Sequence, residues 1–351
     1  METCASNERV ELRSDPFRTI QIHPTRKCNL SCLHCYSSSA PHLKGMLDIN
    51  ALKKFLPYAF AHGYNNISIS GGEPFMYTEL AELLIYSKSL GFQNTVASNG
   101  MLLLSERNKR ILNYIDLIAI SVDGPRELHD HIRGQIGAFD KMLNGIELLK
   151  KLEKPFGFIH TVTPQSWTSL IWLGEFAHDH GAKLLQLHPL EMYGRALEEL
   201  TNMAIDDTLA HQTFILANYL RSKYAETMVV QLDLLHRDYI ESFPQIVNTF
   251  VGKCSSRKKI SDIFDTIIIE ETGKLLPFAY GFESSLAIGN INNFSNSLFE
   301  EYLHEKIPVI ESLFNHTYQN IIKNKEVDIA NWNELIVNNS KKIVFEGSLI
   351  D

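Results

Sequence analysis

The sequence predicts an α/β protein, built as a partial (βα)6 TIM-like barrel with a smaller α+β extension. Between residues 18 and 190, short β-branched runs alternate with longer amphipathic stretches, which is the pattern of repeated βα units around a parallel sheet. After about residue 200 this alternation stops. We therefore expect a polar leader over residues 1–17, the partial barrel over 18–200 and a C-terminal region over 201–351.

Six segments of the barrel region have the length and residue types of strands. They lie near Thr19–His23, Asn66–Ser70, Asn94–Ser98, Leu117–Val122, Phe156–Val162 and Lys183–His188. In folds of this kind the chemistry gathers at the C-terminal ends of the strands.

Five helical segments separate these strands. The first begins after Asp48, whose side chain suits a helix N-cap, and it stops at Gly63. The second, near Thr78–Leu90, repeats leucine at helical spacing. The others cover roughly 105–113, 138–152 and 167–180. Beyond residue 200 we expect helices near 206–224 and 236–250, a strand pair around 266–276 and a mixed, asparagine-rich end.

The composition excludes several classes of protein. With 351 residues, 44% hydrophobic and 21% charged, the chain resembles an ordinary soluble enzyme. The net charge of −8 argues against a broad nucleic-acid-binding surface. No apolar stretch approaches the roughly 18 residues that a membrane span needs. Reduced cysteines and the absence of an export signal predict a cytoplasmic protein.

Three of the five cysteines, Cys28, Cys32 and Cys35, stand in one run directly after the first strand. Iron–sulfur cubanes usually take four cysteine ligands, so a cluster held here would keep one iron free of protein ligands. The competing interpretations are an incomplete zinc site that includes His34, part of a disulfide framework, and small buried apolar residues. No second pair follows nearby, and an odd cysteine count does not suit a disulfide scaffold.

Polar or glycine-rich turns follow other strands. The second strand ends in Gly71-Gly72-Glu73-Pro74, where glycines let backbone approach a ligand and Glu73 can receive a cation or amine. The other turns are Ser98-Asn99-Gly100, Ser121-Val122-Asp123-Gly124 with Arg133 beyond it, and Gly194-Arg195. Taken alone, each of these motifs also fits an ordinary turn.

In this order, the motifs resemble those of radical S-adenosylmethionine (SAM) enzymes, in the branch that often carries a C-terminal SPASM or twitch extension. The resemblance spans roughly residues 18 to 200. It implies a [4Fe-4S] cluster on Cys28, Cys32 and Cys35, with SAM chelating the remaining iron. Glu73, within the turn Gly71-Gly72-Glu73-Pro74, would hold the methionine amine.

The resemblance also implies further contacts to SAM. Tyr36 would lie near the adenine, while Ser98 and Asn99 would lie near the ribose or the methionine moiety. Ser121 would contact the same cofactor. A guanidinium fork matches a carboxylate, so either Arg133 or Arg195 would pair with the SAM carboxylate.

In this family the reduced cluster and SAM supply a 5′-deoxyadenosyl radical that removes a hydrogen atom from a substrate. A flavodoxin or ferredoxin is the implied electron source. Many relatives with such an extension crosslink, epimerise or oxidise ribosomally made peptides, so peptide maturation is our leading hypothesis. The alternatives are a small-molecule biosynthetic enzyme, acting on a sugar, cofactor or tetrapyrrole precursor, and a non-catalytic iron–sulfur sensor or assembly factor.

The leader of residues 1–17 is too short for a separate peptide-recognition domain, so a leader peptide would need a partner protein or the C-terminal region. An edge strand of the hairpin is one place where an extended peptide can add. On the substrate side, His160, Gln186 and His188 can face the cavity, although each is also explained as a satisfied interior residue.

The C-terminal region resembles a SPASM or twitch extension whose auxiliary-cluster cysteines have been lost. Cys254 precedes the predicted strand pair, and Pro277-Phe278 stands where another cysteine is expected. One thiolate cannot hold a cubane of the usual kind, so we predict one cluster per chain. Cys254 is then a buried structural residue, a hydrogen-atom donor that quenches a substrate radical, or a surface thiol.

Overall fold

The computed structural model describes residues 17–251 and 259–346, so Cys254 and almost all of the predicted leader lie outside the described residues. Its centre is a ten-stranded sheet with the order β11-β10-β9-β1-β2-β3-β4-β5-β6-β7. The strands of this sheet are β1 Thr19–Ile22, β2 Asn66–Ile69, β3 Gln93–Ser98, β4 Leu117–Ser121, β5 Phe156–Val162, β6 Leu184–Pro189, β7 Val229–Leu232, β9 Thr266–Ile269, β10 Lys274–Pro277 and β11 Gly289–Asn290.

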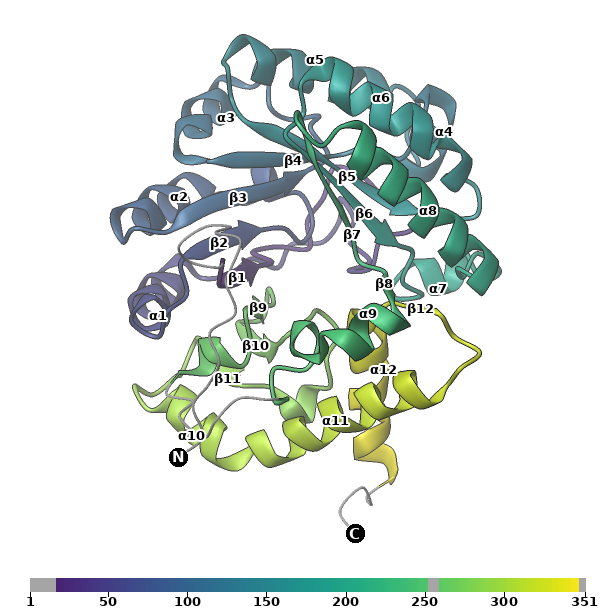
Figure 1. Cartoon of the computed structure of the whole chain (residues 1–351). Helices are drawn as coiled ribbons and strands as arrows, with labels where there is room; N and C mark the ends of the chain where they lie inside the picture. Colours follow the sequence, from purple (N-terminus) through teal and green to yellow (C-terminus); the bar gives the residue numbers. More distant parts are fainter. Residues whose placement is uncertain (1–16, 252–258, 347–351) are drawn as a thin grey trace.

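Strands β1 to β7 run parallel, and their helices cover the outer face of a curved sheet (Figure 1). The six predicted strands correspond to β1–β6 and differ from them by at most one residue at either end. The predicted α/β fold with a partial barrel is therefore confirmed. Strand β7 was missed because it is short and lies at the sheet edge, where Val229 and Gln231 are exposed.

The strands place different chemistry on their two faces. Along β6, Leu185 and Leu187 are fully buried, whereas Gln186 and His188 alternate with them and line the inner cavity. Side chains of a strand point alternately to its two faces, so every second side chain points toward the concave side of the sheet. The apolar outer face packs on helices and holds the core.

The helices of the first 223 residues follow the predicted pattern. They are α1 Ile49–Ala61, α2 Leu80–Ser89, α3 Glu106–Ile111, α4 Arg126–Arg133, α5 Ala138–Lys151, α6 Leu170–His180, α7 Ala196–Glu199 and α8 Asp207–Lys223. Asp48 caps α1 by accepting from the Asn50 amide at 2.9 Å, and Gly63, at φ +98°, follows its end. The short helices α4 and α7 were not predicted.

The predicted strand pair is present as β9 and β10, and it extends the sheet beyond β1. Strand β9 pairs in parallel with β1, so this part of the C-terminal region lies beside the first strand of the barrel. The predicted domain boundary near residue 200 stays a prediction, since β7 also continues the sheet past it.

The helix expected over residues 236–250 is wrong. Helix α9 covers only Arg237–Ser242, because Pro244 has no backbone N–H and disfavours a helical residue before it. The expected mixed end is mostly helical instead. Its elements are α10 Leu298–Glu305, α11 Ile307–Lys323 and α12 Trp332–Glu346, with β8 Leu235–His236 and β12 Ile329–Ala330 forming a small second sheet. Within the described residues, no helix is long and apolar enough to cross a membrane.

Candidate functional site

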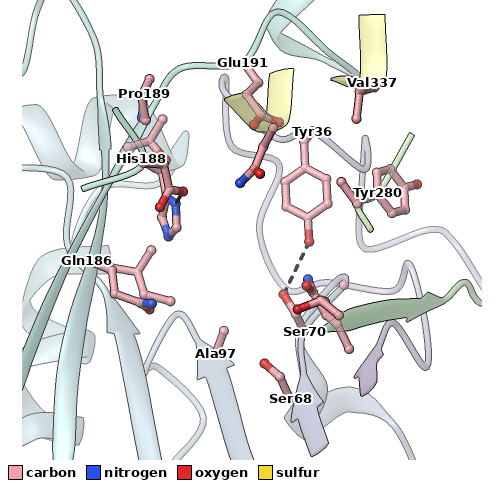
Figure 2. Close-up of a pocket in the computed structure, with 18 of the residues that line it drawn as sticks. Tyr36, Ser68, Ser70, Ala97, Gln186, His188, Pro189, Glu191, Tyr280 and Val337 are labelled. Carbon is pink, nitrogen blue, oxygen red and sulfur yellow. Dashed lines mark hydrogen bonds and ion pairs between the residues drawn. The ribbon is translucent and has the colours of Figure 1, made fainter. Parts of the chain in front are cut away.

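A cavity of about 760 Å³ lies at the C-terminal ends of the parallel strands and is closed on one side by the C-terminal region. The cysteine run and the turns after β2, β3 and β4 contribute to its wall. Figure 2 shows Tyr36 and Ser70 on one side of this cavity, with Gln186 and His188 on the other. Motifs far apart in the sequence therefore share one space.

The three cysteines of the run lie together against Leu30 and Met101. All three are free thiols, and Cys28 and Cys32 are buried. Burial, followed by the charge of Glu73, raises the pKa of Cys28 to about 12. Burial also raises the pKa of Cys32, although the positive charge of Arg133 acts in the opposite direction. Without a metal these two thiols therefore stay protonated, and metal binding would displace their protons.

The donor set fits an iron–sulfur cluster better than a single ion. Among the described residues, no three His, Cys, Asp or Glu side chains approach closely enough to hold one metal ion. A cluster does not need that, because each thiolate binds a different iron. Backbone N–H groups of Leu30 and Ser39 point at the sulfur atoms of Cys28 and Cys35, at 3.4 and 3.3 Å, as outer partners of metal ligands do.

His34 does not complete a four-ligand zinc site with the cysteines. Its Nε2 lies 3.2 Å from Oδ1 of Asp123. The imidazole is thus engaged with a carboxylate. His34 is therefore engaged away from the three thiols.

Glu73 lines the cavity and is surrounded by hydrogen-bond donors. Its carboxylate accepts from Ser98 Oγ at 2.9 Å, from the Asn99 amide at 2.9 Å and from the Phe75 amide at 3.2 Å. Burial nevertheless raises the pKa of Glu73 to about 7, because those hydrogen bonds only partly offset the loss of water. The predicted residues Glu73, Ser98 and Asn99 therefore form one connected group.

The two glycines before Glu73 pack against the chain that enters the cysteine run. Gly71 has φ +101°, and a Cβ added at Gly72 would lie 2.3 Å from the carbonyl oxygen of Lys27. The Gly72 amide donates to Thr25 O at 2.8 Å. The missing side chains therefore let two backbone segments approach each other. Both glycines also line the cavity, so their predicted approach to a ligand stays a prediction. Pro74 starts the next turn and is buried.

Arg133 and Asp123 form a buried ion pair beside Cys32. Arg133 Nε donates to Asp123 Oδ2 at 2.5 Å, while Nη1 lies 3.7 Å from Cys32 Sγ. Burial would raise the pKa of Asp123, but Arg133 and His34 hold it well below its usual range. The guanidinium of Arg133 thus lies beside the Cys32 thiol while its positive charge is paired with the Asp123 carboxylate.

Arg195 binds the main chain of the cysteine run. Its Nη1 and Nη2 donate to the carbonyls of Cys32 and Ser39, each at 2.7 Å, and its amide donates to Cys35 O at 2.9 Å. The preceding Gly194 has φ +58°, and an added Cβ would lie 2.2 Å from Tyr36 O. Gly194 and Arg195, which follow β6, therefore hold the main chain of the cysteine run in place.

Tyr36 is held by aromatic contacts that come from three parts of the chain. Its hydroxyl lies 3.3 Å from Ser70 Oγ, as drawn in Figure 2. The Tyr280 ring meets Tyr36 edge-on at 5.1 Å and stacks on His23 at 4.9 Å. Burial lowers the pKa of His23 to about 3, so this imidazole is neutral. Sequence patterns did not reveal Tyr280, which reaches the site only through the hairpin of β9 and β10.

The opposite wall carries polar groups of β6 and β7. His188 Nδ1 pairs with Asp233, and Gln186 donates to Gln231 at 2.8 Å. Asp233 was not predicted, because strand β7 was not. Ser121 lines the cavity at the end of β4.

His160 has a structural role instead. It is buried, with its nitrogens 2.8 Å from Val122 O and 3.1 Å from Ser166 Oγ. Both ring nitrogens are thereby satisfied inside the barrel wall.

We compared the sequence and the fold of this chain with those of known proteins. Residues 22–176 match the family model described as the Radical SAM superfamily. The chain is 32% identical over 184 residues to the AdoMet-dependent heme synthase of Methanosarcina barkeri, covering 52% of this chain and 53% of that protein. It is 26% identical over 298 residues to the antilisterial bacteriocin subtilosin biosynthesis protein AlbA of Bacillus subtilis, covering 81% and 59%.

Among solved structures, the fold resembles that of anSMEcpe with bound AdoMet and the Cp18Cys peptide. The TM-score is 0.61 at 19% identity, with 95% of this chain and 98% of that chain covered. At such identity the likeness concerns the fold. The chain spans about half the length of the curated relatives that it matches first.

Proposed function

The chain belongs to the radical SAM superfamily, and on this premise we propose that it matures a ribosomally made peptide by hydrogen-atom abstraction. When bound, the cluster and SAM supply the radical that removes the substrate hydrogen. The observation that supports this chemistry is the gathering of three free thiols and the Glu73 group in one cavity. Cys28, Cys32 and Cys35 would hold one [4Fe-4S] cluster.

The chain's own residues position the cofactor. Glu73 would receive the SAM amine, with Ser98 and Asn99 fixing the orientation of its carboxylate. Tyr36, held by Tyr280, would line the adenine side. Arg195 is already bound to carbonyls and Arg133 to Asp123, so neither has its guanidinium fork fully free for the SAM carboxylate.

The peptide substrate is supported by the extent of similarity. The match to the subtilosin biosynthesis protein covers 81% of the chain and so extends beyond the region shared with the superfamily model, whereas the match to the heme synthase covers 52%. Over nearly the whole length of both chains, the fold also resembles that of a protein whose structure was solved with a bound peptide. A partner protein would present any leader peptide, and a flavodoxin or ferredoxin would deliver electrons.

Coexpression tests this proposal. The chain is expressed anaerobically with each short peptide encoded beside its gene, and the peptide is analysed by mass spectrometry in normal and deuterated water. We expect loss of hydrogen or uptake of deuterium at a defined residue, absent with Cys28→Ala. Unchanged peptides, together with conversion of a tetrapyrrole precursor, would instead favour the second candidate, a tetrapyrrole-modifying enzyme, which the 32% identity to heme synthase supports.

A further inference from the structure

Each thiol of the cysteine run has an N–H group near its sulfur, and the three donors differ in kind. At Cys28 and Cys35 the donor is a main-chain amide, 3.4 and 3.3 Å from the sulfur. At Cys32 the donor is a side chain, because Nη1 of Arg133 lies 3.7 Å from the sulfur. Within the part of the chain that the structure describes, Cys32 is thus the thiol of the run that accepts from a charged group.

The position of Arg133 is fixed from two directions. Its Nε donates to Oδ2 of Asp123 at 2.5 Å. The main chain just before it binds the cysteine run, because the Leu33 amide donates to Ile132 O at 2.9 Å. The Arg133 side chain is 9% exposed and that of Asp123 is fully buried, so water competes little for the guanidinium. The contact with Cys32 is therefore built into the end of α4.

Two opposite charges act on Cys32. Of the charged side chains, Arg133 and then Asp123 interact most strongly with this thiol. Glu73 interacts with Cys28 instead. Asp123 thus offsets part of the positive charge of Arg133, whereas the Nη1–H of Arg133 still reaches the sulfur.

Such groups affect the reduction potential of an iron–sulfur cluster, which depends on hydrogen bonds to the sulfur ligands, on charge and on burial. Reduction adds one negative charge. An N–H donor or a positive charge beside a thiolate therefore stabilises the reduced form more than the oxidised form. The hydrogen bond from Arg133 makes the potential less negative, and the carboxylate of Asp123 makes it more negative.

Resting on the cluster of the proposed function, we propose that Arg133, positioned by Asp123, raises the reduction potential of that cluster through its hydrogen bond to the Cys32 thiolate. The step that this favours is the transfer of one electron from a reduced flavodoxin or ferredoxin to the cluster, in which no bond forms or breaks. Arg133 and Asp123 act in opposite directions, so the pair holds the potential between the values that either residue alone would give.

A redox titration of the full chain, reconstituted with iron and sulfide and kept free of SAM, tests this inference. Electron paramagnetic resonance follows the reduced cluster. Arg133→Lys keeps a cation for Asp123, but its ammonium lacks the second N–H arm that reaches Cys32. At a fixed ambient potential the ratio of reduced to oxidised cluster should fall about tenfold, which for one electron is a shift of about 59 mV to more negative potential. An unchanged potential in the iron-loaded variant overturns the proposal.

Asp123→Asn carries the opposite prediction. Its amide oxygen still accepts from Arg133 Nε while the negative charge is gone, so the ratio of reduced to oxidised cluster should rise at least about threefold. A shift of both single variants in the same direction contradicts the proposal. The double variant Asp123→Asn with Arg133→Gln leaves no buried charge unpaired, and its potential should lie below that of Asp123→Asn. Equal potentials contradict the proposal even where Arg133→Lys does not retain iron.

Arg18→Lys is the matched control. Arg18 pairs with Asp262 at 2.8 Å and directly precedes β1, so it lies at the opposite end of that strand from the cysteine run. Its potential should match that of the wild type. Because the titration contains no SAM, a role of Arg133 toward the SAM carboxylate does not move the potential. Weakened SAM binding by Arg133→Lys at an unchanged potential would assign Arg133 to that role and overturn the proposal.

The two proposals fail separately. If the potentials shift as predicted but no peptide is modified in coexpression, peptide maturation is wrong and the role of Arg133 stands. If a peptide is modified but Arg133→Lys keeps the potential of the wild type, the role of Arg133 is wrong and peptide maturation stands.

Discussion

Arg195 Nη1 donates to the main-chain carbonyl of Cys32 at 2.7 Å, across 163 residues of sequence. The same guanidinium binds Ser39 O, so one side chain connects Cys32 and the segment after Cys35 to the chain that follows β6. Arg195 was one of two candidates, with Arg133, for binding the SAM carboxylate. Its contacts also suit a positioning residue for the loop that would hold the cluster, and its role toward SAM stays a prediction.

Arg195→Lys should lower the iron retained after anaerobic reconstitution and gel filtration. An ammonium on a flexible stem does not reproduce the two-pronged fork, so at least one carbonyl bond of about 1–3 kcal/mol is lost. Arg107→Lys is the matched control, because Arg107 also binds two carbonyls, those of Tyr77 and Thr78, but outside the cavity. Normal iron retention with weakened SAM binding would instead support Arg195 as the residue that binds the SAM carboxylate.

Glu73→Gln should weaken SAM binding by about ten- to a hundredfold while iron content stays normal, because a charge-assisted hydrogen bond to the amine is lost. Equilibrium binding of SAM to the reconstituted chain measures this. Glu79→Gln serves as control, since Glu79 accepts from the Tyr77 hydroxyl away from the cysteines. Wild-type affinity in the Glu73 variant would remove this residue from the SAM site.

The ligand-free chain should lose stability as Glu73 ionises. Burial raises its pKa from 4.5 to about 7, so the folded state holds the proton more tightly than the unfolded state. This contribution to the free energy of unfolding is complete below about pH 4.5 and lost as the pH rises through about 7, by up to about 3 kcal/mol. Urea unfolding of the wild type and of Glu73→Gln at several pH values across this range measures the contribution of Glu73. If the free energy of unfolding changes with pH in the same way for both proteins, the prediction is wrong.

Much of this site could be predicted because its motifs follow strands. Cys28 and Glu73 each come after a short apolar run, and parallel strands bring such ends together whatever lies between them. The hydrogen bond between Ser98 and Glu73 was not predicted, although the same rule places both residues at neighbouring strand ends.

Other parts required the structure. Tyr280 and Asp233 reach the cavity from a hairpin and from a short edge strand, and neither position has a local pattern that indicates a ligand. The sequence did not show that the glycines at 71 and 72 also make room for the backbone of residues 25–27, because a missing Cβ leaves no local pattern that identifies its neighbour. The sequence also did not determine which groups Arg133 and Arg195 bind, because a long side chain has many acceptors within reach.

Tyr280→Ala should lower the free energy of unfolding by about 2–3 kcal/mol, since it removes a partly buried ring from contacts with His23 and Tyr36. Tyr280→Phe keeps the ring and should change it by less than about 1 kcal/mol. Urea unfolding measures both, with Tyr239→Ala of helix α9 as an exposed control. If the alanine variants at 239 and 280 lose equal stability, the Tyr280 contact does not join the hairpin to the cysteine run.

The most direct test of the radical SAM site is one anaerobic reconstitution of the full chain, followed by iron analysis and by assay of 5′-deoxyadenosine after addition of dithionite and SAM. We predict about four irons per chain and reductive cleavage of SAM, with both lost when Cys28, Cys32 and Cys35 are replaced by alanine. About eight irons per chain would contradict the single cluster. Retention of the iron by the triple variant, or no 5′-deoxyadenosine from the iron-loaded wild type, would contradict the central claim.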